Sequence, residues 1–136
     1  MEAARQFRIA LTADNFERTL SFYRDVIGLP VQQEWSSPHG RGIVLSIKEA
    51  TLEILDRPHA EMVDTIEAGR RVSGQLRFAF QFSDLQPALA SAKAAGAQLV
   101  HGPVETPWKD LNARLIGPEG IQMTFFQAPV IEPQSH

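Results

Sequence analysis

Hydrophobic and polar residues alternate along two stretches of this chain. In residues 7–13 the large apolar side chains of Phe7, Ile9 and Leu11 fall on one face, which is the period-two pattern of a strand. Residues 76–82 repeat the pattern with Leu76, Phe78, Phe80 and Phe82. We predict a strand over each stretch, with the large apolar face covered by a helix.

An amphipathic helix is predicted directly after each strand. Asp14 and Glu17 fit a capping box at the start of the first helix, and Ser83 and Gln86 fit one at the start of the second. The apolar stripes are Phe16, Leu20, Tyr23 and Ile27 in the first helix, which stops at Gly28, and Leu85, Leu89 and Ala92 in the second, which stops at Gly96. Each stripe is expected to pack on the preceding strand, and Tyr23 is expected in the core.

The two halves of the chain therefore repeat one unit. Aligning Arg8 with Arg77, an offset of 69 residues (77 minus 8), also aligns Leu20 with Leu89. Short β-prone runs follow each helix, at 30–36, 41–47 and 51–56 in the first half and at 98–101, 112–116 and 121–127 in the second. We predict a β-α-β-β-β repeat over about 6–56, a linker over 57–74 with at most one weak helical turn around 60–68, a second repeat over about 75–127 and a tail over 128–136.

Composition excludes several classes of protein. The 13 basic and 16 acidic residues give a net charge of −3, which leaves no electrostatic footprint for nucleic acid. The absence of cysteine excludes disulfides, Cys-ligated zinc, iron–sulfur clusters and thiol nucleophiles. No stretch reads as a signal peptide or a membrane helix. We expect a soluble, cytoplasmic protein with neither a nucleic-acid nor a membrane partner.

The sheet face that turns away from each helix carries small and polar side chains. They are Arg8, Ala10, Thr12 and Glu53 in the first repeat, and Arg77, Ala79, Gln81, Gln122, Thr124 and Phe126 in the second. Sheet twist cups such a face, and a polar lining of this kind is typical of a pocket wall.

Three stretches carry a family pattern over roughly residues 7–127. They are IALTADNFERTLSFYRDVIGL, FAFQFSDLQPALASAKAAGA and PWKDLNARLIGPEGIQMTFFQ. They resemble the vicinal oxygen chelate superfamily, which includes glyoxalase I, bleomycin-resistance proteins and extradiol dioxygenases. The resemblance implies an α+β fold in one domain over 1–136, whose two β-α-β-β-β repeats form a cupped eight-stranded mixed sheet, commonly in a homodimer.

The resemblance also implies where a metal would bind. Metal-dependent members hold a divalent ion with a His on the first strand and a Glu on the last strand of each repeat, and these positions fall here on Arg8, Glu53, Arg77 and Thr124. A guanidinium has no lone pair to donate, so both arginines would repel the ion, and only Glu53 is a usable ligand. We predict no metal and no other cofactor.

The two arginines admit two interpretations. Arg8 and Arg77 together would clamp a carboxylate, phosphate or sulfonate of a small ligand. Alternatively, Arg8 pairs with Glu53 across the sheet, which leaves Arg77 as the better ligand candidate. Trp108 either stacks on a flat ligand at the pocket mouth or packs under a loop, and Trp35 belongs either to the pocket wall or to a dimer interface.

Three functions remain open. The first is a metal-free protein that binds a small aromatic or anionic molecule, including an antibiotic that it sequesters. The second is a lyase, isomerase or dioxygenase with an altered metal site or with Glu53 as base. The third is a non-catalytic structural or interaction domain. The predicted ligand-binding residues are Arg8, Thr12, Glu53, Arg77, Gln81, Trp108, Gln122, Thr124 and Phe126.

Overall fold

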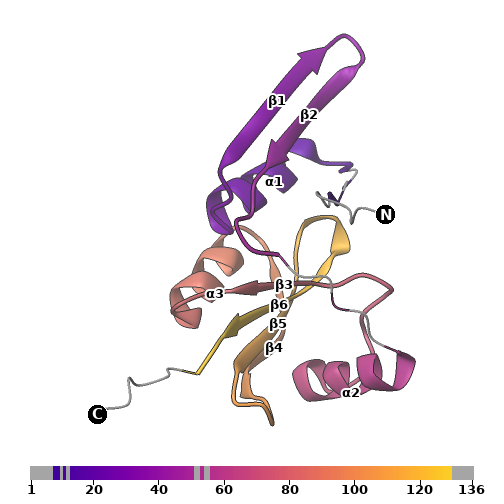
Figure 1. Ribbon diagram of the computed structural model, residues 1–136, viewed down its shortest axis with the longest axis vertical. Helices are drawn as coiled ribbons and strands as arrows, with labels where there is room; N and C mark the ends of the chain where they lie inside the picture. The colour runs from indigo at the N-terminus through magenta and orange to yellow at the C-terminus, as the bar shows by residue number, and fades with distance from the viewer. Residues whose placement is uncertain (1–7, 10, 12, 51–52, 54–55, 130–136) are drawn as a thin grey trace, which may run out of the picture.

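The computed structural model describes residues 8, 9, 11, 13–50, 53 and 56–129, which contain helices and two sheets (Figure 1). The elements in chain order are α1 (Phe16–Ser21), the π-helical turn η1 (Phe22–Val26), β1 (Val31–Ser37), β2 (Gly40–Leu45), α2 (Arg57–Ala68), β3 (Phe78–Gln81), α3 (Leu85–Ala94), β4 (Gln98–Glu105), β5 (Leu111–Ile116), the 3₁₀ turn η2 (Pro118–Gly120) and β6 (Gln122–Gln127). Strands β1 and β2 form an antiparallel hairpin. The other four strands form a sheet in the order β3-β6-β5-β4, in which β3 runs parallel to β6.

The core lies between α3 and one face of the four-stranded sheet. Leu85, Leu89 and Ala92 of α3 are buried, which confirms the predicted apolar stripe. Met123 and Phe125 of β6 are fully buried against them, so the predicted helix-facing side of this strand is also confirmed. Strand alternation then turns Thr124 to the opposite face.

The first helix packs into the same core. Asn15 is its N-cap, because the side chain of Asn15 accepts a hydrogen bond from the Arg18 amide, and the predicted cap Asp14 lies one residue too early. The second predicted cap is displaced in the same way, from Ser83 to Asp84. Tyr23 and Phe22 in η1 are buried among the residues that α3 and the sheet contribute, so the core position expected for Tyr23 is confirmed. Burial raises the pKa of the Tyr23 hydroxyl to about 12.

Two predicted strands of the first repeat are not found where the structure describes the chain. Residues 8, 9, 11 and 13 are not in a strand, and the side chains of Ile9 and Leu11 are 57% and 38% exposed. Glu53 and Asp56 are also outside any strand. Residues 7, 10, 12, 51, 52, 54 and 55 lie outside the described residues. The α+β fold is confirmed, whereas six strands are described and the predicted count of eight is not confirmed.

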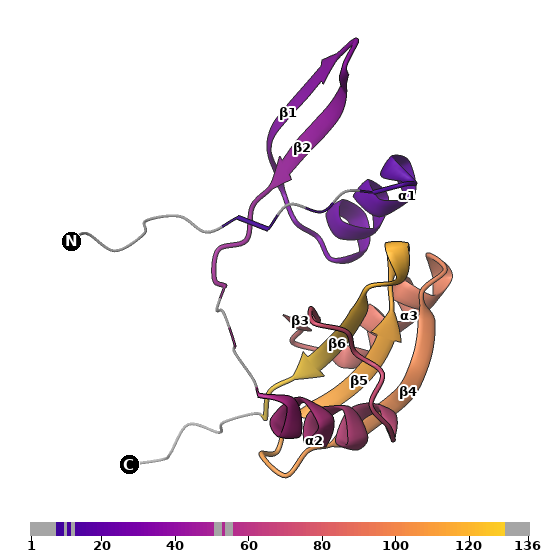
Figure 2. The same cartoon turned by 90° about the vertical axis from the view of Figure 1, so that its right-hand side faces the viewer.

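The segment between the repeats contains a full helix, so the prediction of one weak helical turn there is wrong. Helix α2 begins after Asp56, whose side chain accepts from the His59 amide, and ends at Gly69 with φ of 78°. It lies on the sheet face opposite α3 (Figure 2). The polar sequence concealed this helix because two of its buried residues are Asp64 and Glu67.

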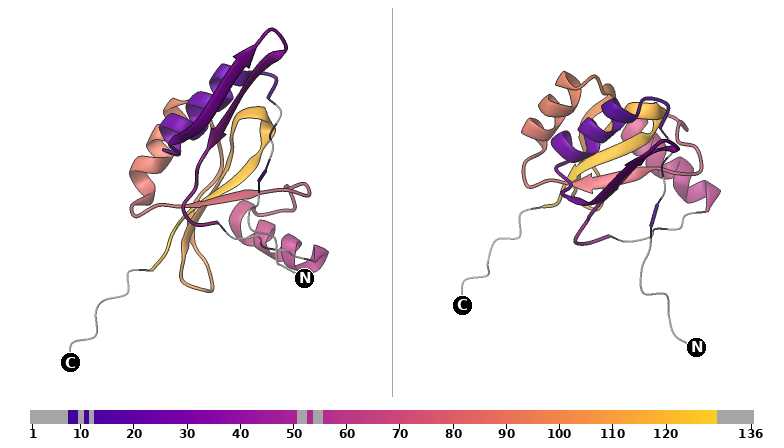
Figure 3. Two further views of the ribbon diagram at one scale, coloured as in Figure 1. Left: turned by 45° about the horizontal axis from the view of Figure 1, so that its top comes forward. Right: turned by 90° about the horizontal axis from the view of Figure 1, so that it is seen from above.

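The β1–β2 hairpin projects past one end of the four-stranded sheet, with α1 beside it (Figure 3). A carboxylate from η2 connects this half to the other, since Glu119 Oε1 accepts from the Asn15 amide at 2.8 Å. No helix in the described part of the chain is long and apolar enough to cross a membrane.

Candidate functional site

A cluster of charged and polar side chains fills the space between α2 and the sheet. Its centre is Arg114 of β5, whose side chain is completely buried. The guanidinium donates from Nη1 to Asp64 Oδ1 at 2.8 Å, and from Nε and Nη2 to Glu67 Oε1 at 3.2 and 3.0 Å. A buried guanidinium requires such partners, because an unpaired buried charge costs several kcal/mol.

Asp64 is the more heavily bonded of the two carboxylates. Besides Arg114, it accepts from Arg71 Nη1, the amides of Val72 and Ser73, and the Ser73 hydroxyl, at 2.6–2.8 Å. Burial alone raises the pKa of this carboxyl, but the bonds from Ser73, Val72 and Arg71 outweigh it and hold the pKa well below its usual range. Asp64 is therefore ionised throughout the physiological range.

Glu67 connects the cluster to the face where the sequence predicts a ligand. Its Oε1 also accepts from the Thr124 hydroxyl, and its Oε2 accepts from Asn112 Nδ2 at 2.9 Å. The Thr124 hydroxyl in turn accepts from Arg77 Nη1 at 2.8 Å. Arg77, Thr124, Glu67 and Arg114 therefore form one continuous chain of hydrogen bonds.

Arg77, which is half-buried, stands at one end of this series of hydrogen bonds. In the described part of the chain no carboxylate lies within ion-pairing distance of its guanidinium. Arg77 directly precedes β3, and Ala79 and Gln81 of that strand are exposed. The start of β3 therefore offers a half-buried cation beside a polar, small-residue surface.

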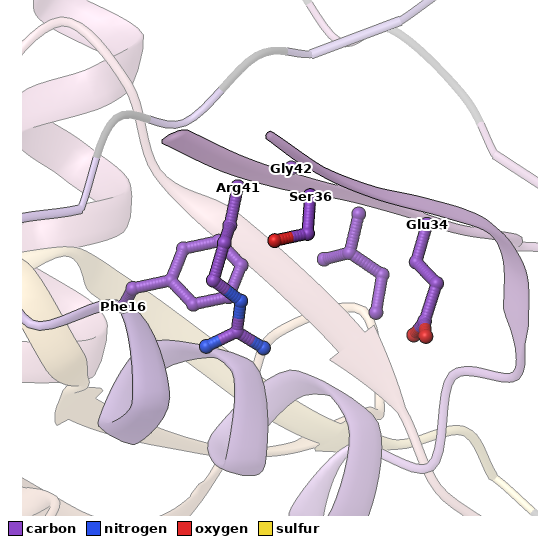
Figure 4. A pocket seen from close by; sticks show the side chains of 6 residues that line it. Phe16, Glu34, Ser36, Arg41 and Gly42 are labelled. Carbon is purple, nitrogen blue, oxygen red and sulfur yellow. The ribbon is translucent and has the colours of Figure 1, made fainter. Parts of the chain in front are cut away.

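A hollow with a volume of about 160 Å³ lies between α1 and the hairpin (Figure 4). It is lined by Phe16, Glu34, Ser36, Arg41, Gly42 and Ile43. The Arg41 guanidinium stands 4.7 Å above the Phe16 ring and pairs with Glu17. Ligand pockets usually measure about 300–1,000 Å³, so this hollow is smaller than a usual ligand site. We therefore take the sheet face around Arg77 as the candidate site.

Comparison with known proteins identifies the family. The model of the Glyoxalase/Bleomycin resistance protein/Dioxygenase superfamily matches residues 5–125. The chain belongs to this superfamily. The predicted family is thereby confirmed, whereas no curated protein sequence matches the chain.

Solved structures share the fold at low sequence identity. A protein of unknown function from Agrobacterium tumefaciens str. C58 is 19% identical, with 95% of this chain and 98% of that chain covered and a TM-score of 0.63. A glyoxalase/bleomycin resistance protein/dioxygenase family enzyme from Burkholderia phytofirmans PsJN is 22% identical, with coverages of 87% and 93% and a TM-score of 0.57. TnmS3, an antibiotic binding protein from Streptomyces sp. CB03234, is 19% identical, with coverages of 90% and 100% and a TM-score of 0.55.

The metal-ligand positions of the superfamily do not fit a divalent ion here. Arg77 and Thr124 are bonded to each other, and a guanidinium contributes a positive charge where the ion would sit. Arg8 and Glu53 are both exposed, and the ion pairs of the described residues do not include one between them. Nor does the described part of the chain hold a group of three His, Asp or Glu side chains suited to a metal.

The structure brings together only some of the predicted site residues. Phe126 shares the face of Thr124 and is half-buried opposite Asn112 of β5. Gln122 lies on that face too, with its Oε1 buried and unpaired within the described residues. Trp108 is 44% exposed in the turn between β4 and β5. Thr12 and the side chain of Trp35 lie outside the described part, although the backbone of Trp35 pairs with Gly42 in the hairpin.

Sequence reasoning missed the residues of the cluster, namely the buried Asp64, Glu67, Asn112 and Arg114 and the half-buried Ser73. A signal was available in β5, where Asn112 and Arg114 alternate with Ala113 and Leu115 and therefore share the face of Thr124. No comparable signal marked the carboxylates of α2, because a polar segment with a proline and two glycines resembles a surface connection.

Proposed function

We propose that this chain binds a small molecule through an anionic group, a carboxylate, phosphate or sulfonate, on the sheet face around Arg77. The proposal rests on the Arg77 guanidinium. It donates one hydrogen bond to the Thr124 hydroxyl and forms no ion pair with a carboxylate of the described residues. An arginine presents five N–H donors in a rigid fork that matches such anions. The remaining donors are the basis for ligand binding.

An aromatic ring on the ligand is the second part of the proposal. Phe126 follows Thr124 by two residues on β6, so its half-buried ring lies on the same face. Gln81 of β3 pairs with Phe126 in the sheet and adds an exposed amide. Anion recognition at Arg77 and stacking on Phe126 together favour a flat, anionic molecule.

Binding rather than metal chemistry agrees best with these residues. Two of the four superfamily metal positions are arginines, and TnmS3, which shares the fold, is an antibiotic binding protein. We therefore propose sequestration or transport of a small aromatic anion. The homodimer that the resemblance implies stays a prediction, which light scattering tests.

The experiment compares Arg77→Ala with wild type, with 1-naphthalenesulfonate and benzoate as probes and calorimetry and thermal shift as readouts. Loss of a charged hydrogen-bond donor costs about 1.5–3 kcal/mol, so we expect affinity to fall about 10- to 100-fold. Arg24→Ala is the matched control, since Arg24 is exposed and pairs with its neighbour Asp25. It should leave binding unchanged.

Two results would contradict the proposal. One is equal affinity in wild type and Arg77→Ala. The other is binding that disappears when a chelator is added and returns with a divalent metal, which would favour the metal-dependent enzyme instead.

A further inference from the structure

We propose that α2 is a displaceable cover over the anion site, and that the Glu67 carboxylate competes with the ligand's anionic group for Arg114 and Thr124. This inference rests on the proposed function and extends it, because it makes Arg114 a second cation for the ligand. In the covered state Glu67 occupies the place that a ligand anion would take.

The bonds of Glu67 resemble those of a bound ligand. One oxygen, Oε1, receives two bonds from the Arg114 fork and one from the Thr124 hydroxyl. Arg77 approaches the same point through Thr124 Oγ1. The Arg114 guanidinium and the Thr124 hydroxyl therefore converge on one carboxylate oxygen, and Arg77 lies one hydrogen bond further away, so a cation and a hydroxyl already hold an anion at this point.

Asp64 has a different role. Among the described residues, four of its five bonds come from Arg71, Val72 and Ser73, which follow α2 in the chain and would move with the helix. Within the same part of the chain, Glu67 bonds to residues of the sheet alone: Asn112, Arg114 and Thr124. Asp64 therefore ties the end of α2 to its own loop, while Glu67 carries most of the polar attachment to the sheet.

The apolar attachment of α2 is small. Val63 is its one buried apolar side chain among the described residues, whereas α3 buries Leu85, Leu89 and Ala92. Met62 of α2 is 43% exposed. A buried ion pair contributes little net free energy once its desolvation cost is subtracted, so the bonds of Glu67 hold the helix weakly. An anion that replaces Glu67 on Arg114 can therefore release α2, and the release exposes little buried apolar surface.

The cover also explains how Arg114 becomes available. Its side chain is 0% exposed, so an anion outside the protein reaches Arg77 first and Arg114 only after α2 moves. The observed affinity is then the intrinsic affinity reduced by the fraction of molecules in which α2 is displaced. Weakening the hold of Glu67 should raise that fraction.

The test uses the full chain, 1-naphthalenesulfonate and the variant Glu67→Gln. Glutamine keeps the size of the side chain and one oxygen that can accept from Thr124 and Arg114, but it carries no negative charge, and its amide nitrogen cannot accept from Asn112 Nδ2 as Glu67 Oε2 does. We expect the dissociation constant of the probe to fall about tenfold. Glu61→Gln is the matched control, since Glu61 is exposed on the same helix, and it should leave the affinity unchanged.

Hydrogen exchange on wild-type protein supplies a measurement that does not depend on a variant. If the probe displaces α2, the amides of residues 57–68 should exchange faster with probe than without it. Ligand binding without displacement would leave their exchange unchanged or slower, which overturns the cover. This measurement decides alone if Glu67→Gln does not fold.

The outcomes separate the two proposals. Binding that Arg77→Ala abolishes, together with no tightening in Glu67→Gln and no faster exchange in 57–68, would overturn the cover and leave the proposed function standing. Absence of binding in both wild type and Glu67→Gln would overturn both. Binding that appears only in Glu67→Gln would support the cover.

Discussion

The two halves of the chain share a sequence pattern but use it differently. In the second half, α3 and the four-stranded sheet bury one another, and Leu89, Leu115 and Phe125 are all within the core. In the first half the hairpin forms a separate two-stranded sheet, and α1 with η1 sends Phe22 and Tyr23 into the core of the second half. The same sequence pattern therefore has two outcomes. The second half forms a core of its own, and the first half packs its helix into that core.

The difference shows what periodicity determines. An apolar stripe specifies that a helix will bury one side, but it does not specify the surface that receives it. Phe78 and Phe80 face Tyr23 at centroid distances of 6.3 Å, so the strand of the second half serves the helix of the first. The equivalent residues of the first half, Ile9 and Leu11, are exposed.

The largest expected loss of stability comes from Arg114→Met, which removes the buried cation on the polar face of the four-stranded sheet. The change leaves Asp64 and Glu67 buried without their shared cation, and removing one partner of a buried ion pair costs about 3–5 kcal/mol. Urea unfolding monitored by circular dichroism measures this loss.

Arg24→Met is the control for that experiment in the first half. Arg24 pairs with Asp25 at the exposed surface, where an ion pair contributes about 0–1 kcal/mol. Equal losses in the two variants would mean that the cluster under α2 is not buried, and the contrast between the halves would then fail.

The next prediction compares two leucines that the repeat aligns. Leu89 belongs to the shared core, whereas Leu20 is buried outside it. Leu89→Ala should cost about 3 kcal/mol, because it leaves a cavity in close-packed surroundings, and Leu20→Ala should cost about 2 kcal/mol. Chemical unfolding of both variants checks the order, and a larger loss for Leu20→Ala would reverse the assignment of the core to the second half.

Sequence reasoning predicted the elements in which apolar side chains recur at regular helix or strand spacing. The apolar stripe Leu85, Leu89 and Ala92 and the alternation in β6 both fixed the buried face, because burial there is apolar and regular. The family could also be predicted, since its pattern spans both repeats. The helix caps were displaced by one residue at Asn15 and Asp84, where neighbouring polar residues compete for the same role.

The buried polar cluster could not be predicted for a physical reason. Asp64 and Glu67 are buried only because Arg114 lies opposite them, some 50 residues later in the chain, and a single charged residue predicts exposure. Arg77 and Thr124 were predicted to share a face, and their hydrogen bond places them together. Their roles in ligand binding stay predictions.

The smallest expected effect concerns the attachment of the first half to the second. Glu119 Oε1 accepts from the Asn15 amide at 2.8 Å and from the Thr19 hydroxyl at 3.4 Å, so a carboxylate of η2 caps the start of α1. Glu119→Ala should destabilise the protein by about 1 kcal/mol, as expected for loss of a helix cap. Alanine keeps a β-carbon at this position, where φ is 63°, so the backbone strain does not change.

Amide exchange by NMR shows where this loss falls. We expect faster exchange in α1 and η1 of Glu119→Ala and unchanged exchange in β5 and β6, because the second half keeps its own core. Glu105→Gln is the control, since Glu105 is exposed and pairs with Lys109 at the surface. Exchange that rises equally in both halves would show that they unfold as one unit. Helix α1 would then belong to the core as fully as α3 does.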